Sequence, residues 1–163
     1  MTELNKAKKS IEIIMYLIEY NEEKGENKIE EILNTLIKKR KEGVNVLVIL
    51  SADNYGNIHL KRNNEKVKEY LEEGGVSVFI NYGSQETHDK LVVIDDRIVF
   101  IGAHNFSIAA LFYNNELSLL LKADTDIPQI KEYVKKTLDK CIYSKQKNIS
   151  LKNNEIEIWS KRN

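Results

Sequence analysis

The first half of the chain alternates short apolar runs with segments in which apolar residues recur every three or four positions. The continuous runs are rich in Val, Ile and Leu, as in strands buried on both faces, and they lie at 11–17, 44–50 and 76–80. The segments 27–43 and 64–73 between them have the spacing of amphipathic helices. This order predicts parallel strands joined by crossover helices.

The second half follows a different rhythm. Asp95-Asp96 interrupts an apolar stretch, and a short polar break of this kind predicts a tight hairpin between the runs 88–94 and 97–102. Ser107 is expected to cap a short helix over 107–113. The run 116–121 is typical of a strand, but it is too uniformly apolar to face water.

We therefore expect one α/β domain over residues 1–143, with a mixed sheet flanked by helices on both faces. A short basic helix at 2–9 should open it, and a final amphipathic helix should begin near Pro128. Residues 144–163 form a polar tail, to which the piece 156–159 could add a short strand. The polar stretches 21–27 and 51–57 are expected to be loops.

Charge and composition exclude several classes of protein. The chain has 25 Lys and Arg against 25 Asp and Glu, so no global basic field marks a nucleic-acid partner and a local patch must gather any anion. Cys141 is the single cysteine, which rules out an internal disulfide and favours a reducing cytoplasm. No apolar stretch approaches the roughly 20 residues of a spanning helix, and no signal-peptide pattern is evident.

His88 and Lys90 stand at the head of the apolar run 88–94. Side chains in a strand alternate between faces, so these two should project to the same side, roughly 6.5 to 7 Å apart. Two basic groups at one point suggest an anion such as phosphate. The imidazole can attack phosphorus while the ammonium neutralises the non-bridging oxygens.

The surroundings of this pair make the signal specific. His88, Lys90, Asp95, Gly102 and Asn105 match H-x-K, four residues, D, six residues, G-[SAG]-x-N. The stretch closely resembles the motif of the phospholipase D superfamily. The resemblance extends over roughly residues 2–142. Upstream, the segments 7–17 and 38–50 resemble the family's first strand, helix and second strand, and after the motif come a helix and a strand that opens with a carboxylate, as in the family.

The single copy of the motif makes the chain most similar to bacterial endonucleases of the Nuc type, which are homodimers. The resemblance implies that one histidine attacks phosphorus to give a phosphohistidine and that a second protonates the leaving oxygen. One chain supplies only His88 for these two tasks. A two-fold dimer would supply the second copy.

The resemblance also implies a role for each motif residue. Lys90 and Asn105 would hold the phosphate, with the backbone of Gly102 and Ala103 beside them, although the family often has Ser where this chain has Ala103. The carboxylate that opens the next strand, Glu116, would accept the His88 N–H and fix its tautomer.

Four further features carry weaker expectations, each with a plain structural alternative. Asp95 counts among the catalytic set, but it falls in the predicted turn, so its role is expected to be architectural. His104 could add an imidazole or be a turn residue, and His59 could join a backbone-binding patch or lie in a solvated loop. The basic segment 38–41 most simply ends a helix.

The function implied is a metal-independent phosphodiesterase without a cofactor, in the first place a nuclease acting on DNA or RNA. The sequence contains no Cys pair, no H-E-x-x-H and no dense group of Asp residues that would indicate a metal site. Two alternatives stay open. One is a phosphodiesterase for a phospholipid or another small diester, and the other is a non-catalytic dimeric module that binds nucleic acid.

Overall fold

The computed structural model describes residues 1–20, 28–52, 56–83 and 85–160, with side chains as far as residue 146. The loop expected at 21–27, the middle of the loop expected at 51–57 and the last three residues of the tail lie outside the described residues.

Eleven helices and strands are present in the described part of the chain. In order they are α1 (Thr2–Lys6), β1 (Ser10–Met15), α2 (Lys28–Lys41), β2 (Asn45–Ser51), α3 (Ile58–Glu73), β3 (Ser77–Asn81), β4 (Lys90–Ile94), β5 (Ile98–Gly102), α4 (Ile108–Phe112), β6 (Ser118–Lys122) and α5 (Pro128–Ser160). The strands form one sheet in the order β3-β2-β1-β4-β5-β6. The first three are parallel and the last three are antiparallel, so the predicted mixed sheet is confirmed.

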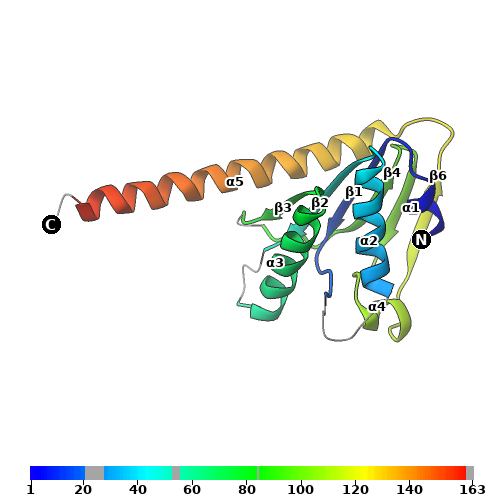
Figure 1. Ribbon diagram of the computed structural model, residues 1–163, viewed down its shortest axis with the longest axis horizontal. Helices are drawn as coiled ribbons and strands as arrows, with labels where there is room; N and C mark the ends of the chain where they lie inside the picture. Colours follow the sequence, from blue (N-terminus) through cyan, green and yellow to red (C-terminus); the bar gives the residue numbers. More distant parts are fainter. Residues whose placement is uncertain (21–27, 53–55, 84, 161–163) are drawn as a thin grey trace.

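Helices cover both faces of the sheet, as the sequence predicts (Figure 1). On one face, α2 and α3 pack through residues such as Leu33 and Leu71 onto alternate strand residues such as Ile13 and Val48. On the other face, α5 packs onto the intervening strand residues, among them Ile14. The alternation of side chains along each strand therefore feeds two apolar layers.

The predicted hairpin between β4 and β5 is confirmed. Asp95 and Asp96 both have positive φ, at 53° and 61°, and the Arg97 N–H donates to Ile94 O at 3.1 Å. Two consecutive left-handed residues form a type I′ turn, whose twist matches that of the strands it joins. Aspartate tolerates this conformation better than most residues do.

Two helices differ from the expectation. The short N-terminal helix ends at Lys6 rather than Lys9, and α3 begins at Ile58, six residues earlier than expected. The side chain of Asn57 caps α3 by accepting from the Leu60 N–H at 3.1 Å. Because Leu60 is the only buried residue between 58 and 63, this part of the helix has no apolar periodicity to detect.

The expected strand at 156–159 is wrong, because these residues belong to α5, which continues to Ser160. No Gly or Pro follows Pro128, so nothing in the sequence stops the helix at the expected boundary of 143. Figure 1 shows the C-terminal part of α5 extending away from the sheet. None of the described helices is long and apolar enough to cross a membrane.

The edge strand β6 differs from the expectation that its apolar residues are shielded from water. Its five residues are all exposed in the single chain, although the sequence is too apolar to face water. Ile101, Leu117, Leu119 and Leu121, here called the β6 patch, are exposed at 42%, 78%, 61% and 47%. Such a patch on an edge strand is typical of a surface that binds another protein.

Candidate active site

The motif residues other than Asp95 lie near the edge of the sheet where β1 and β5 end and where β4 and β6 begin, here called the site end. Lys90 pairs with Met15 of β1, and Gly102 of β5 pairs with Ser118 of β6. Since Leu91 pairs with Ile101, the position opposite Lys90 on β5 is Gly102. Residues far apart in sequence thus share one row across four strands.

His88 and Lys90 lie together at this end, as the sequence predicts. His88 precedes β4 and is exposed, and Lys90 is the first residue of the strand. The Lys90 Nζ lies 3.1 Å from His88 Nδ1 and 3.4 Å from Nε2, and it donates to the His88 carbonyl oxygen at 2.8 Å. The ammonium and the imidazole can therefore contact one oxyanion.

Burial lowers the pKa of the Lys90 ammonium, although the carboxylates of Asp89, Glu116 and Glu86 act in the opposite direction. Glu116 is therefore close enough to influence Lys90. A phosphate bound beside Lys90 would add negative charge and favour the ammonium form.

Tyr16 is a neighbour of the pair that the motif did not reveal. Its ring centroid lies 4.6 Å from that of His88, and Lys90 Nζ lies 5.1 Å from the Tyr16 centroid. The sequence placed Tyr16 only in the first predicted strand, and no local signal marked it. The contact depends on the register between β1 and β4, which the sequence did not specify.

Glu116 does not make the expected contact. It accepts a hydrogen bond from Asn114 Nδ2 at 3.1 Å, and no hydrogen bond joins it to His88 in the described part of the chain. Glu116 lies near the site through its effect on Lys90, but the role of fixing the His88 tautomer remains a proposal.

Gly102 and Ala103 both take part in the pairing of β5 with the segment that contains β6. A Cβ at Gly102 would overlap Ser118, so glycine is required by the close approach of β5 and β6. The Ala103 N–H, expected to remain free for phosphate, donates to Leu117 O at 3.1 Å. The Ala103 N–H is thus already paired, and its expected contact with phosphate stays a prediction.

Asn105 carries an unsatisfied polar atom. Its Oδ1 is buried without a hydrogen-bond partner among the described residues. The adjacent backbone is fixed, because the Phe106 N–H donates to Leu17 O at 3.1 Å and Phe106 O accepts from the Glu19 N–H at 2.8 Å. An unsatisfied buried group costs about 1–3 kcal/mol, and a turned amide would present its NH2 group at the same point.

Asp95 lies at the other end of the hairpin, about 16 Å from Lys90 at the rise of a strand. Its carboxylate accepts backbone N–H groups of Lys8, Lys9 and Ser10 at 2.6 to 3.1 Å. Burial alone would raise the pKa of Asp95, but these hydrogen bonds outweigh it and lower the pKa. These contacts agree with the architectural role expected for Asp95, and its place in the catalytic set stays a prediction.

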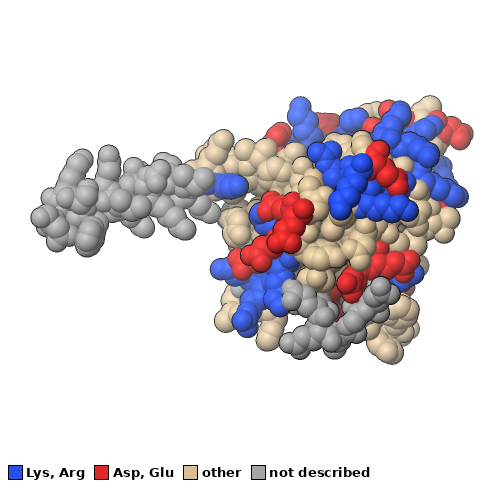
Figure 2. Space-filling model, in the orientation of Figure 1, with Lys and Arg blue, Asp and Glu red and all other residues tan. Residues whose placement is uncertain are grey.

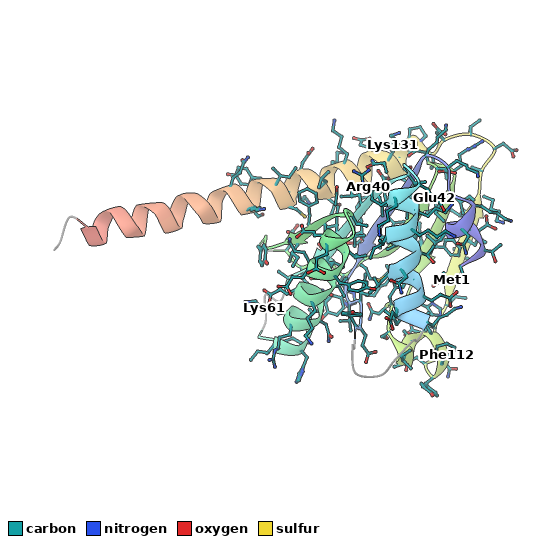
Figure 3. All side chains as sticks on the ribbon, viewed as in Figure 1. Met1, Arg40, Glu42, Lys61, Phe112 and Lys131 are labelled. Atoms are coloured by element: carbon teal, nitrogen blue, oxygen red, sulfur yellow. The ribbon has the colours of Figure 1, made fainter. Side chains whose placement is uncertain are left out.

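Of the other basic residues that the sequence indicates, His104 lines the same cavity as Lys90, whereas His59 and the segment 38–41 do not line it. His104 Nδ1 lies 2.6 Å from Ser118 Oγ, and His59 is exposed in the first turn of α3 rather than in a loop. Arg40, within the basic segment 38–41, lies at the opposite end of α2 from Phe112 of α4 (Figure 3). Lys and Arg are interspersed with Asp and Glu over the face drawn in Figure 2.

No group of three His, Cys, Asp or Glu residues that could hold a metal ion occurs among the residues described. The chemistry available at the site end is that of an imidazole, an ammonium and a carboxamide.

The comparison with family models decides the family. Residues 1–139 match the model described as "Cardiolipin synthase, PLD-like domain". The chain belongs to the phospholipase D-like family. No curated protein matches it.

Solved structures share the phospholipase D-like fold. Nuc from Salmonella typhimurium, a phospholipase D family member, is 22% identical with a TM-score of 0.65, covering 85% of this chain and 82% of its own. NucT from Helicobacter pylori is 23% identical with a TM-score of 0.65, covering 86% and 85%. Phosphatidylserine synthase from Haemophilus influenzae is 18% identical with a TM-score of 0.56, and 84% of this chain corresponds to 33% of that one.

Proposed function

We propose that this phospholipase D-like protein is a metal-independent phosphodiesterase, in the first place a nuclease that hydrolyses DNA or RNA. The observation that carries the proposal is the contact between the His88 imidazole and the Lys90 ammonium. The match to the Nuc-type motif and the shared fold with Nuc and NucT favour a nucleic acid as substrate.

The reaction proceeds in two displacements. A His88 ring nitrogen attacks phosphorus and the bond from phosphorus to the leaving oxygen breaks, while a second imidazole gives that oxygen a proton. Water then attacks the phosphohistidine and gives its proton to the second imidazole as the P–N bond breaks. Lys90 and Asn105 hold the non-bridging oxygens as negative charge develops on them.

The second imidazole is His88 of another copy in a two-fold dimer, and the β6 patch supports this part of the proposal. The patch includes Ile101 and Leu119, which pair in the sheet next to the Gly102–Ser118 pair at the site end. An isologous contact over this surface would bury the exposed leucines and bring the two site ends toward the axis.

Hydrolysis of DNA, RNA and bis(p-nitrophenyl) phosphate in excess EDTA tests the activity. We expect turnover by the wild type and none above background by His88→Gln. Activity that persists in the variant, or that requires added metal, would refute the mechanism. Nucleic acid bound with a steep salt dependence but never cut would show a binding module instead.

The dimer is tested separately with Leu119→Glu, which places a charge in the β6 patch. We expect a monomer by light scattering and loss of activity, because each copy then lacks its second imidazole. Ile58→Glu is the matched control, since Ile58 is 65% exposed on α3 and belongs to no part of the patch. An active Leu119→Glu monomer would disprove a shared site.

A second candidate substrate is a lipid-like diester, favoured by one observation. A cavity of about 300 Å³ adjoins Lys90 and is lined mainly by apolar side chains, among them Leu4, Met15, Phe106 and Leu111. An aliphatic chain would fill such a space without leaving polar groups unpaired. Release of headgroup from phospholipid vesicles, with nucleic acids left intact, would establish this substrate.

A further inference from the structure

Tyr16 lies at the centre of the site end although it belongs to no motif. Its ring is tilted by 53° against the His88 imidazole, and the Lys90 ammonium lies over the same ring. Tilted aromatic pairs and cation–π contacts are both favourable beyond the burial of apolar area. One ring therefore contacts both residues that act on the phosphate.

The backbone of Tyr16 is fixed on both sides. Its N–H donates to Asp89 O at 3.0 Å, and its carbonyl oxygen accepts from Asn64 Nδ2 at 2.8 Å. Asn64 is fully buried in α3, where Nδ2 also donates to Ser51 O at 2.9 Å and Oδ1 accepts from the Ile18 N–H at 3.2 Å. The backbone that carries the ring is thus fixed by hydrogen bonds that join β1, β2 and α3.

His88 has much less support of its own. It is exposed and lies in the segment before β4, outside the regular ladder. An exposed imidazole on such a segment samples several rotamers, and fixing one of them costs conformational entropy. A ring already held in place can reduce that cost before the substrate arrives.

We propose that Tyr16 is a positioning residue of the reaction, whose ring holds the His88 imidazole and the Lys90 ammonium in the orientation needed to act on one phosphate. The inference rests on the proposed function of the same site. It predicts that the ring, rather than bulk or polarity, is what matters. A misplacement of about 1 Å can cost on the order of a hundredfold in rate.

The test compares Tyr16→Phe, which keeps the ring, with Tyr16→Leu, which keeps an apolar side chain without it. With a small diester in EDTA, we expect Tyr16→Leu to lower kcat by about 10- to 100-fold with little change in KM, and Tyr16→Phe to stay within about threefold of the wild type. A KM effect with an unchanged kcat would overturn the proposal.

Tyr20→Leu is the matched control. Tyr20 pairs with Tyr70 at 4.8 Å between centroids, so the same substitution there removes an aromatic pair that does not contact His88. We expect Tyr20→Leu to lower the melting temperature but to keep kcat. An equal loss of kcat in Tyr20→Leu would show a general effect of destabilisation and overturn the proposal.

A second readout does not depend on turnover. The C–H resonances of the His88 ring should show a ring-current shift that is retained in Tyr16→Phe and lost in Tyr16→Leu. If the resonances do not move, the positioning role is refuted even when activity depends on His88. If the shift behaves as expected but His88→Gln keeps full activity, the proposed function fails while the contact stands.

Discussion

The two ends of the β4–β5 hairpin carry residues of the same motif, but their polar groups are treated differently. At the turn, three backbone N–H groups satisfy the Asp95 carboxylate. At the site end, the Asn105 Oδ1 has no partner among the described residues, and burial lowers the pKa of Lys90. The Asp95 carboxylate thus stabilises the fold at the turn, whereas His88 and Lys90 at the site end are exposed or half-buried. One motif can thus contain both a residue that stabilises the fold and residues suited to chemistry.

The largest effect should come from His88→Gln, which removes the nucleophile from the site end. We expect kcat for bis(p-nitrophenyl) phosphate to fall by about ten-thousandfold with an unchanged melting temperature. His59→Gln is the control, because His59 is exposed on α3 and should leave kcat unchanged. A similar loss in both variants would contradict a specific role for His88.

At the turn between β4 and β5, Asp95→Ala should lower the stability of the fold rather than the activity. We expect the free energy of unfolding to fall by about 2 kcal/mol in urea titrations, since three backbone donors lose a charged acceptor, while kcat per folded molecule is kept. Asp96→Ala is the control in the same turn, because the Asp96 carboxylate pairs with the exposed Lys131 at 2.8 Å and an exposed ion pair contributes little to stability. A loss of kcat in folded Asp95→Ala would return Asp95 to the chemistry.

The pH dependence of stability sharpens this contrast. The folded pKa of Asp95 lies below its ordinary value of 3.8, so the stabilisation is fully present above that value and is lost as pH falls through the lower folded pKa. The difference in unfolding free energy between wild type and Asp95→Ala should therefore shrink below about pH 4. A difference that stays constant to the lowest pH measured would contradict the assigned hydrogen bonds.

A smaller effect is expected for Lys90→Arg, which keeps the charge but changes its shape. Because burial lowers the pKa of Lys90, the ammonium loses its proton as pH rises through a value below 10.5, and wild-type kcat/KM should fall in that range. The variant should be about tenfold slower at neutral pH, without this alkaline fall, because arginine stays charged. An identical alkaline limb in both proteins would assign it to another group.

The smallest effect is expected for Ala103→Ser, which restores the hydroxyl common in the family. Ala103 is exposed, so a hydroxyl fits there, and one added hydrogen bond to phosphate should raise kcat/KM by about 3- to 10-fold. Ala109→Ser, at another exposed alanine on α4, is the control and should change nothing. A decrease in Ala103→Ser would indicate a different phosphate position.

Local patterns predicted most of this fold because the core elements have clear periodicity. The strands, α2 and the Asp95-Asp96 turn follow from side-chain alternation and turn chemistry. The start of α3 was missed because its polar first turns rely on the cap at Asn57, and the helical tail was missed because only the absence of Gly and Pro indicated it. Short-range rules do not report such features.

The candidate site divides in the same way. The motif spacing brought His88 and Lys90 together because both lie on one segment. The position of Tyr16 depends on the pairing of β1 with β4, which joins residues more than 70 positions apart. The hydrogen bond from the Ala103 N–H to Leu117 O depends on the approach of the segment that leads into β6. Local spacing in the sequence does not predict contacts between strands that are distant along the chain.

The most direct test of the central claim is a crystal structure of the protein soaked with vanadate. We expect one oxyanion on a two-fold axis, with a His88 imidazole from each copy on opposite sides and both Lys90 ammonium groups within hydrogen-bonding distance. A vanadate ion bound by a single chain, or two His88 rings too far apart to contact one ion, would contradict it.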